Sequence, residues 1–220
     1  GYAGTGKTTT IGTFVNSLGM AGKKAVLLAP TGRAAKVISL YSKKPAFTIH
    51  KKIYFPKKQS NGAVAFVLQP NKHTNTIFIV DEASMIPDGK QNQQLFDASS
   101  LLDDLISYVY SGVNCKLIFI GDTAQLPPVK LSVSPALEQD ILTYDYHKEV
   151  TEIELDEVMR QHVDSGILAN ATALRLLLKN EGDAFQFDVD FTDIIRLEDG
   201  YDIEDAIVTA YESSGVEDTA

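Results

Sequence analysis

The first eight residues constrain this chain most, because they read GYAGTGKT and match the phosphate-loop pattern G-x-x-x-x-G-K-[ST]. The glycines let the backbone curl, so that successive N–H groups form a concave nest for phosphate oxygens. Lys7 supplies a positive charge to the β- and γ-phosphates, and the hydroxyl of Thr8 is suited to ligate Mg²⁺. The stretch therefore predicts a nucleoside triphosphate site.

An amphipathic helix is predicted directly after the loop, at residues 8–18, where apolar side chains recur on one face and Gly19 marks the end. The positive end of the helix dipole adds to the attraction for a bound anion. ATP with Mg²⁺ is the ligand that we expect. The residues expected to bind ATP are Gly4, Thr5, Gly6, Lys7, Thr8 and Thr9.

Charge is distributed unevenly along the chain. The net charge of the 220 residues is −9, which alone argues against a nucleic-acid partner. Residues 1–130 hold 15 Lys and Arg against 7 Asp and Glu, whereas residues 131–220 hold 5 against 22. The difference suggests contact with a polyanion confined to the front of the chain, although a charge run is also typical of a solvated surface.

Composition excludes other classes of protein. No apolar run approaches the roughly 20 residues that span a bilayer, so no membrane partner is expected. Cys115 is the single cysteine, so a reducing, cytoplasmic location is the expectation, and the four histidines add no metal-ligand spacing. A phosphate loop normally follows a buried strand, and none precedes Gly1, so we expect the chain to be part of a longer protein.

Short apolar runs alternate with helical patterns along the chain. The runs at 25–29, 77–80 and 117–120 are typical of parallel strands buried on both faces. This alternation predicts an α/β fold, with a mainly parallel sheet flanked by helices. Helices are expected at 33–41, 92–110, 134–142 (capped by Ser134), 164–180 and around 203–210, and further strands at 152–155 and 194–197.

Residues 42–76 differ in character from the rest, because they are rich in lysine and polar side chains. Apolar segments at 53–55 and 63–68 flank a stretch that contains Asn61-Gly62, a pair that favours a tight turn. We interpret residues 52–73 as a basic β-hairpin inserted into the main domain. A surface excursion without a role is the alternative.

Polar residues follow the predicted strands, where ligands of parallel sheets bind. Asp81 is suited to hold the Mg²⁺ shell opposite Thr8, and Glu82 to orient and deprotonate an attacking water. Gln125 is placed to sense the γ-phosphate or to position that water. Asp122 fits a turn cap equally well, so no role is assigned to it.

Six motifs in order resemble those of superfamily 1B DNA helicases, the RecD-like and Dda-like branch. They cover residues 1–161 and lie at 1–8, 29–35, 48–51, 80–85, 121–129 and 155–161. The resemblance implies a P-loop NTPase fold of the RecA-like type and a motor that couples ATP hydrolysis to movement along single-stranded DNA, with 5′-to-3′ polarity. Residues 1–162 would form the first RecA-like domain, and residues 163–220 a connecting helix and the start of the second.

The resemblance also implies roles for individual residues. Arg160 would be an arginine finger on the γ-phosphate. The hairpin takes the place of the family's strand-separating pin, where Phe66, Phe55 or Tyr54 could stack on a base. The residues implied to contact DNA are Pro30, Thr31, Arg33, Thr48, His50, Lys51 and Phe66.

Two other functions remain open at this point. One is a P-loop ATPase that acts on a client other than DNA, and the other is a nucleic-acid-binding module whose ATPase has decayed. Intact Lys7, Thr8, Asp81, Glu82 and Arg160 argue against decay. The second half of the family's ATP site is not present in this sequence, so we expect weak nucleotide binding by this piece alone.

Overall fold

The computed structural model describes residues 5–58, 62, 64–88, 100–129, 131–155, 165–178 and 185–214. The chain divides into two compact units, Gly1–Arg160 and Gln161–Ala220. The first unit holds the sheet, and the second holds α5 (Gly166–Leu178) and α6 (Gly200–Ser214). That the second unit begins another RecA-like domain stays a prediction.

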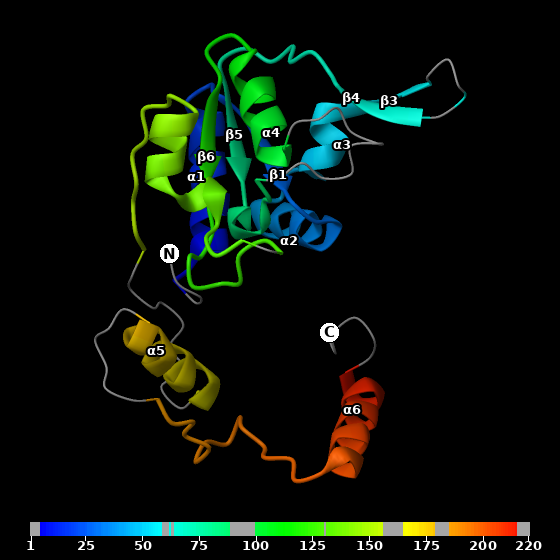
Figure 1. The fold of residues 1–220 in the computed structure, drawn as a ribbon, viewed down its shortest axis with the longest axis vertical. Helices are drawn as coiled ribbons and strands as arrows, with labels where there is room; N and C mark the ends of the chain where they lie inside the picture. Colours follow the sequence, from blue (N-terminus) through cyan, green and yellow to red (C-terminus); the bar gives the residue numbers. More distant parts are fainter. Residues whose placement is uncertain are drawn as a thin grey trace. The chain divides into compact units, whose positions relative to one another are not determined.

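A parallel four-stranded sheet forms the centre of the first unit, in the order β2-β1-β5-β6 (Figure 1). Its strands are β1 (Lys24–Ala29), β2 (Ala46–Thr48), β5 (Thr76–Val80) and β6 (Lys116–Phe119). The predicted parallel sheet is therefore confirmed, and its fourth strand is β2, which the sequence pattern did not reveal.

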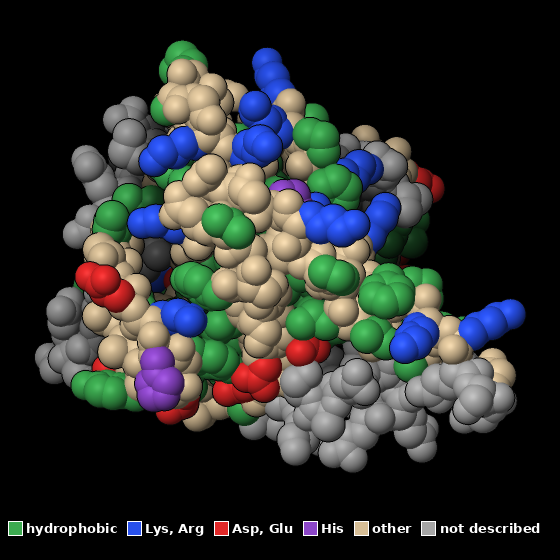
Figure 2. All heavy atoms as spheres, turned by 90° about the horizontal axis from the view of Figure 1, so that it is seen from above, with side chains coloured by type: hydrophobic (Ala, Val, Ile, Leu, Met, Phe, Trp, Pro, Cys, Tyr) green, Lys and Arg blue, Asp and Glu red, His purple; other side chains and the backbone are tan. Residues whose placement is uncertain are grey.

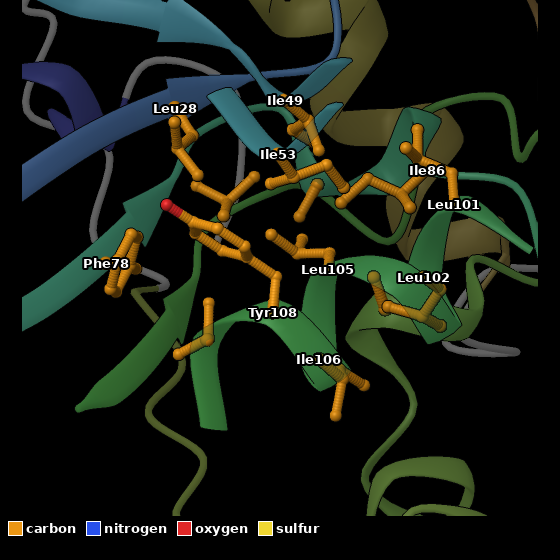
Figure 3. Close-up of a cluster of buried hydrophobic side chains, with 14 of the residues drawn as sticks. Leu28, Ile49, Ile53, Phe78, Ile86, Leu101, Leu102, Leu105, Ile106 and Tyr108 are labelled. Atoms are coloured by element: carbon orange, nitrogen blue, oxygen red, sulfur yellow. The ribbon is translucent and has the colours of Figure 1, made fainter. Parts of the chain in front are cut away.

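Side chains of the central strands alternate between two apolar layers, as the two-residue period of a strand requires. Leu27 and Ile79 pack against α1 (Lys7–Met20) and α2 (Gly32–Ser42). Their neighbours Leu28, Phe78 and Val80 point to the other face. That face is covered by α3 (Ile49–Ile53) and α4 (Leu101–Tyr110), and Figure 3 shows their side chains meeting those of β1 and β5.

Close contact between α1 and α2 depends on Gly12. A Cβ atom at this position would lie 3.1 Å from the carbonyl oxygen of Tyr41. The absence of a side chain therefore lets the two helices approach backbone to backbone on one face of the sheet.

The inserted hairpin is present, with β3 (Tyr54–Lys58) antiparallel to β4 (Val64–Leu68). Its base is anchored to the core. Tyr54 is 9% exposed, and its hydroxyl donates a 2.6 Å hydrogen bond to Oδ2 of Asp104 in α4. The amide of Gln69, just after β4, donates to the carbonyl of Lys52 in α3.

Several predicted elements differ in the structure. The helix expected at 134–142 is two short turns, η2 (Pro135–Leu137) and η3 (Ile141–Asp145), and the Ser134 side chain makes no capping hydrogen bond. The strands expected at 152–155 and 194–197 are not formed, because neither segment pairs with a described strand. Alternating apolar and polar side chains are typical of a strand, but the backbone of a strand must also form hydrogen bonds with a neighbouring strand.

The other predicted helices are present with shifted ends. Described residues of the helix expected at 92–110 begin at Ser100, which caps α4 through a reciprocal pair of hydrogen bonds with Asp103. Residues 92–99 lie outside the described part. Among the helices that the structure describes, none is long and apolar enough to cross a membrane.

We predict that Tyr54→Phe lowers the free energy of unfolding by about 1.5–3 kcal/mol, since it removes a buried hydrogen bond to a charged group. Urea denaturation of the chain measures the change. Tyr41→Phe is the matched control, because Tyr41 is 56% exposed. Equal losses in the two variants would show that the Tyr54 hydroxyl does not anchor the hairpin.

Candidate active site

The phosphate loop leads directly into α1. Gly6 has φ 76° and ψ 19°, a left-handed conformation that glycine adopts without a steric penalty, and α1 begins at the next residue. The carbonyl of Gly6 accepts a 2.9 Å hydrogen bond from the N–H of Thr10. No acidic side chain lies in the first turn of α1, so the positive end of its dipole is not neutralised there.

Lys7 faces the loop that follows β6. Its Nζ lies 3.9 Å from Oδ2 of Asp122, and the two side chains are only 13% and 2% exposed. Asp122 also caps its own turn, because its Oδ1 accepts a hydrogen bond from the N–H of Ala124. Asp122 is therefore a site residue that the sequence did not single out, although its place after a buried strand was a signal.

Asp81 follows β5 and continues the ladder, because its N–H donates a 3.0 Å hydrogen bond to the carbonyl of Leu28. Its side chain is 5% exposed. Burial raises the pKa of the Asp81 carboxyl, and the charge of Glu82 acts in the same direction. A hydrogen bond from the Glu82 N–H and the charge of Lys7 oppose this shift.

Glu82 has a left-handed backbone, with φ 53° and ψ 39°. A non-glycine residue in this region costs about 1 kcal/mol or more, and such strain often occurs at functional sites. Its N–H points back to Oδ1 of Asp81 at 3.0 Å. The turn makes the chain leave the strand abruptly at Glu82 and enter η1 (Ala83–Met85).

The segments after β5 and β6 are held together. Ser84 Oγ donates a 3.1 Å hydrogen bond to Oε1 of Gln125, and the N–H of Ala83 donates to the carbonyl of Ile120 at 2.9 Å. Gly121 permits this approach, since a Cβ atom there would lie 3.1 Å from the backbone nitrogen of Ser84 and 2.8 Å from Leu137 Cδ1. Gln125 is therefore positioned by the segment that carries Asp81 and Glu82.

Two threonines implied to contact DNA cap helices. Thr31 Oγ1 accepts a hydrogen bond from Ala34 N–H at the start of α2, and Thr48 Oγ1 accepts one from Lys51 N–H at the start of α3. Each hydroxyl retains its own proton as a donor. Capping therefore fixes both side chains at the sheet edge where β1 and β2 end.

An open groove of about 720 Å³ lies between α2 and β2. Of the residues implied to contact DNA, the groove brings together Thr48 and Lys51 but not the others. Its lining consists of small, apolar and basic residues, namely Gly32, Ala35, Lys36, Ser39, Leu40, Lys43, Ala46, Phe47, Thr48 and Lys51.

The other residues implied to contact DNA lie elsewhere in the first unit. Arg33 is exposed on α2, next to partly buried Pro30 and Thr31. His50 is half-buried, its ring lies 5.8 Å from that of Tyr54, and burial lowers its pKa.

The aromatic residues of the hairpin differ in exposure. Phe66 lies on β4 opposite Pro56 and packs in part against the core. Tyr54 is buried, whereas Phe55 is 39% exposed. Gly4, Arg160 and the side chain of Thr8 lie outside the part of the chain that the structure describes.

A cleft of about 430 Å³ runs beside β6, from Lys7 along Leu117 and Ile118 to the segment 148–155. The cleft follows an outer strand of the described sheet.

A phosphate loop at the start of a helix, with carboxylates at the ends of the neighbouring parallel strands, defines a P-loop nucleotide-binding domain. A profile of the AAA domain family matches residues 1–188, and the chain belongs to this family.

Relatives of this chain include two helicases. It is 31% identical over 167 residues to the "ATP-dependent DNA helicase dda" of Enterobacteria phage T4, covering 74% of this chain and 34% of that protein. It is 30% identical over 176 residues to the "ATP-dependent RecD2 DNA helicase" of Deinococcus radiodurans, covering 79% of this chain and 21% of that protein. The resemblance predicted from the motifs is thus confirmed, and the chain spans about a third or less of these relatives.

A solved structure, Bacteroides Pif1 bound to ssDNA, matches with a TM-score of 0.48 at 19% identity. The match covers 94% of this chain and 50% of that one.

We predict that Asp81→Asn raises the melting temperature of the chain at neutral pH. The raised pKa means that the native state binds more protons than the unfolded state, so stability falls as pH rises from the ordinary carboxyl range through the folded pKa. Asparagine removes the buried charge and retains the acceptor for Glu82 N–H.

Thermal unfolding of both proteins at several pH values measures this effect. The advantage of the variant should shrink as pH falls below the ordinary aspartate pKa. Asp145→Asn, at an exposed carboxylate, serves as the control. A variant less stable than the parent at pH 7 would show that the Asp81 charge stabilises the fold.

Proposed function

We propose that this chain is the N-terminal motor domain of an ATP-dependent DNA helicase, which moves 5′-to-3′ along single-stranded DNA. The observation that supports it most is one sheet edge that carries Lys7, Asp81, Asp122 and the ordered Gln125. The names of the Dda and RecD2 relatives support DNA as the substrate. The basic groove between α2 and β2 supports the same interpretation, because it would offer lysines to the phosphates of that substrate.

ATP with Mg²⁺ fits the residues present. Mg²⁺ keeps several waters and uses one or two protein carboxylates together with phosphate oxygens, so a dedicated cage is not needed. Accordingly, no cluster of three His, Cys, Asp or Glu side chains occurs among the described residues. Asp81 and Thr8 would hold the ion, which would supply charge neutralisation at the phosphates.

The remaining groups would act on the reacting phosphate. Lys7 would exchange its ion pair with Asp122 for the β- and γ-phosphates, and the loop of Gly4, Thr5 and Gly6 with the start of α1 up to Thr9 would surround them. Glu82 would orient and deprotonate the attacking water, with Gln125 beside it. Arg160 would neutralise charge that develops on the γ-phosphate.

Single-stranded DNA would run along the sheet edge that carries the groove. Thr48 and Lys51 would contact phosphates within the groove, and Pro30, Thr31, Arg33 and His50 would extend the path. Phe66 would act from the hairpin. Residues 1–162 would form this domain and residues 163–220 the connection to a second one, in a cytoplasmic protein.

The test uses the protein encoded by the whole reading frame. We predict at least tenfold stimulation of ATP hydrolysis by single-stranded DNA, with Lys7→Ala and Arg160→Ala each lowering turnover at least about 100-fold. Rates are compared without nucleic acid and with single-stranded DNA, duplex DNA and RNA.

Each alternative gives a distinct result in this assay. A rate indifferent to nucleic acid would indicate an ATPase with another client. DNA binding without any hydrolysis would indicate a binding module with a decayed ATPase.

We further predict that Ser84→Ala lowers turnover about three- to tenfold, because it releases the side chain of Gln125. A double-mutant cycle with Gln125→Ala measures whether the two residues act together. In the Gln125→Ala background, the substitution at Ser84 should have little further effect. Additive losses would show that Ser84 does not act through Gln125.

A further inference from the structure

The basic side chains of the first unit lie mainly in one stretch of sequence. Residues 1–80 contain 12 Lys and Arg and no Asp or Glu, and the first carboxylate of the chain is Asp81. Lys36, Lys43 and Lys51 from this stretch line the groove already described. A second group lies at the edge of the sheet where the strands begin.

We name this second group the amino-edge patch. Lys24 begins β1 and is in register with Thr76, and Lys116 begins β6 and is in register with Ile77. Because β5 lies between them, the Cα atoms of the two lysines are about 10 Å apart. Thr76 and Ile77 are consecutive, so the two lysine side chains leave the sheet on opposite faces, and the patch wraps around the edge where the strands begin. The patch consists of Lys23, Lys24, Lys52, Lys72, His73 and Lys116.

Figure 2 looks down on the end of the molecule where the connections into β5 and β6 lie. Lys and Arg side chains surround a histidine there, and the Asp and Glu side chains in view lie towards the rim. None of the five patch lysines has a carboxylate oxygen within 4.0 Å among the described residues. Lys23, Lys24, Lys72 and Lys116 are exposed, so their charges are open to an anionic partner, whereas Lys52 is partly buried with its Nζ over the ring of Phe47.

Hydrogen bonds hold the centre of the patch in place. The side chain of Asn71 donates to the carbonyl of Tyr108 at 2.9 Å and accepts from the N–H of His73. The carbonyl of His73 accepts from Val113, and its ring meets Phe78 edge-on at 5.3 Å. The segment that carries Lys72 and His73 is therefore anchored at the ends of α4 and β5.

The charges of neighbouring lysines change the pKa of His73. Burial lowers its pKa most, and the charges of Lys52 and Lys24 lower it further. These two lysines come from α3 and β1, so they converge on one point from separate elements.

The hairpin relates the patch to the groove. Five residues of strand separate the two sheet edges, which is about 17 Å. Neighbouring residues Lys51 and Lys52 of α3, directly before the hairpin, point in different directions, since successive helical side chains are about 100° apart. Lys51 lines the groove, whereas Lys52 acts on His73.

We propose that the amino-edge patch binds the phosphate backbone of the nucleic-acid strand that is displaced from the strand in the groove. Two strands that part at the hairpin would then each meet a basic surface, one in the groove between α2 and β2 and one at the edge where the strands begin. The proposal depends on the proposed function for the identity of the polyanion. Contacts of this kind carry no sequence preference, because lysines reach only phosphates.

The test compares binding of two DNAs to the protein from the whole reading frame, without ATP. One is a single strand, and the other is a fork that carries the same strand and a second unpaired arm. We expect the parent protein to prefer the fork, and Lys24→Gln/Lys116→Gln to lose about tenfold in fork affinity. The slope of log K against log salt concentration for the fork should become smaller in magnitude by roughly 1.4, because two phosphate contacts to a single strand are lost.

Lys24→Arg/Lys116→Arg is the matched control, because it keeps both charges at the same positions and should keep the fork preference. Single-strand affinity and the ATPase stimulated by single-stranded DNA should stay unchanged in both double variants.

The proposal is overturned if the parent shows no preference for the fork, if the glutamine variant keeps it, or if the arginine variant loses it as well. An acidic protein segment as the true partner of the patch would give the second of these results. Failure of the proposed function is separate, since it would appear as an ATPase of the parent that does not respond to single-stranded DNA.

Discussion

Strand β5 is the element on which the rest of the site depends. It hydrogen-bonds to β1 on one side and to β6 on the other, and its side chains fill both apolar layers. The ladder continues past its end, because Asp81 N–H bonds to Leu28 and Ala83 N–H bonds to Ile120. The positions of Asp81 and Glu82 are therefore fixed by the same bonds that hold the sheet together.

The site carries costs that the fold must offset. Asp81 is a buried carboxylate whose pKa is raised by burial, and Glu82 has a strained backbone. The charge of Lys7 opposes the rise in the pKa of Asp81. The Nζ atom of Lys7 also lies 3.9 Å from Oδ2 of Asp122. The lysine is thus held at the site by a carboxylate partner.

The sequence predicts those parts of the fold whose pattern is local to one segment of the chain. The apolar runs within β1, β5 and β6 stand out in sequence because side chains on both faces of these strands pack against apolar layers. Strand β2 and helix α3 span three and five residues, which is too short for a periodic pattern to show. Apolar and polar side chains alternate at residues 152–155, as they do in a strand. A strand also needs a neighbouring strand to pair with, and the alternation does not show whether one is present.

The same reasoning applies to the site. Lys7, Asp81 and Glu82 were predicted because their motifs join a residue type to a strand or helix end. The proximity of Asp122 to Lys7, and of Ser84 to Gln125, joins segments 41 residues or more apart in the chain. Distances of this kind depend on strand order, which the local pattern does not contain. The capping roles of Thr31 and Thr48 were hidden for a different reason, since a hydroxyl can cap a helix and contact a phosphate at once.

Charge separates the two edges of the sheet more sharply than the net charge of the chain suggests. At the edge where strands end, Lys7 pairs with Asp122 and its charge acts on Asp81, so the lysine is balanced by carboxylates. At the edge where strands begin, lysines stand without a carboxylate among the described residues, so a bare polyanion is favoured. A single sheet therefore presents a lysine balanced by carboxylates at one edge and unbalanced lysines at the other, because the parallel arrangement places all strand ends together and all strand starts together.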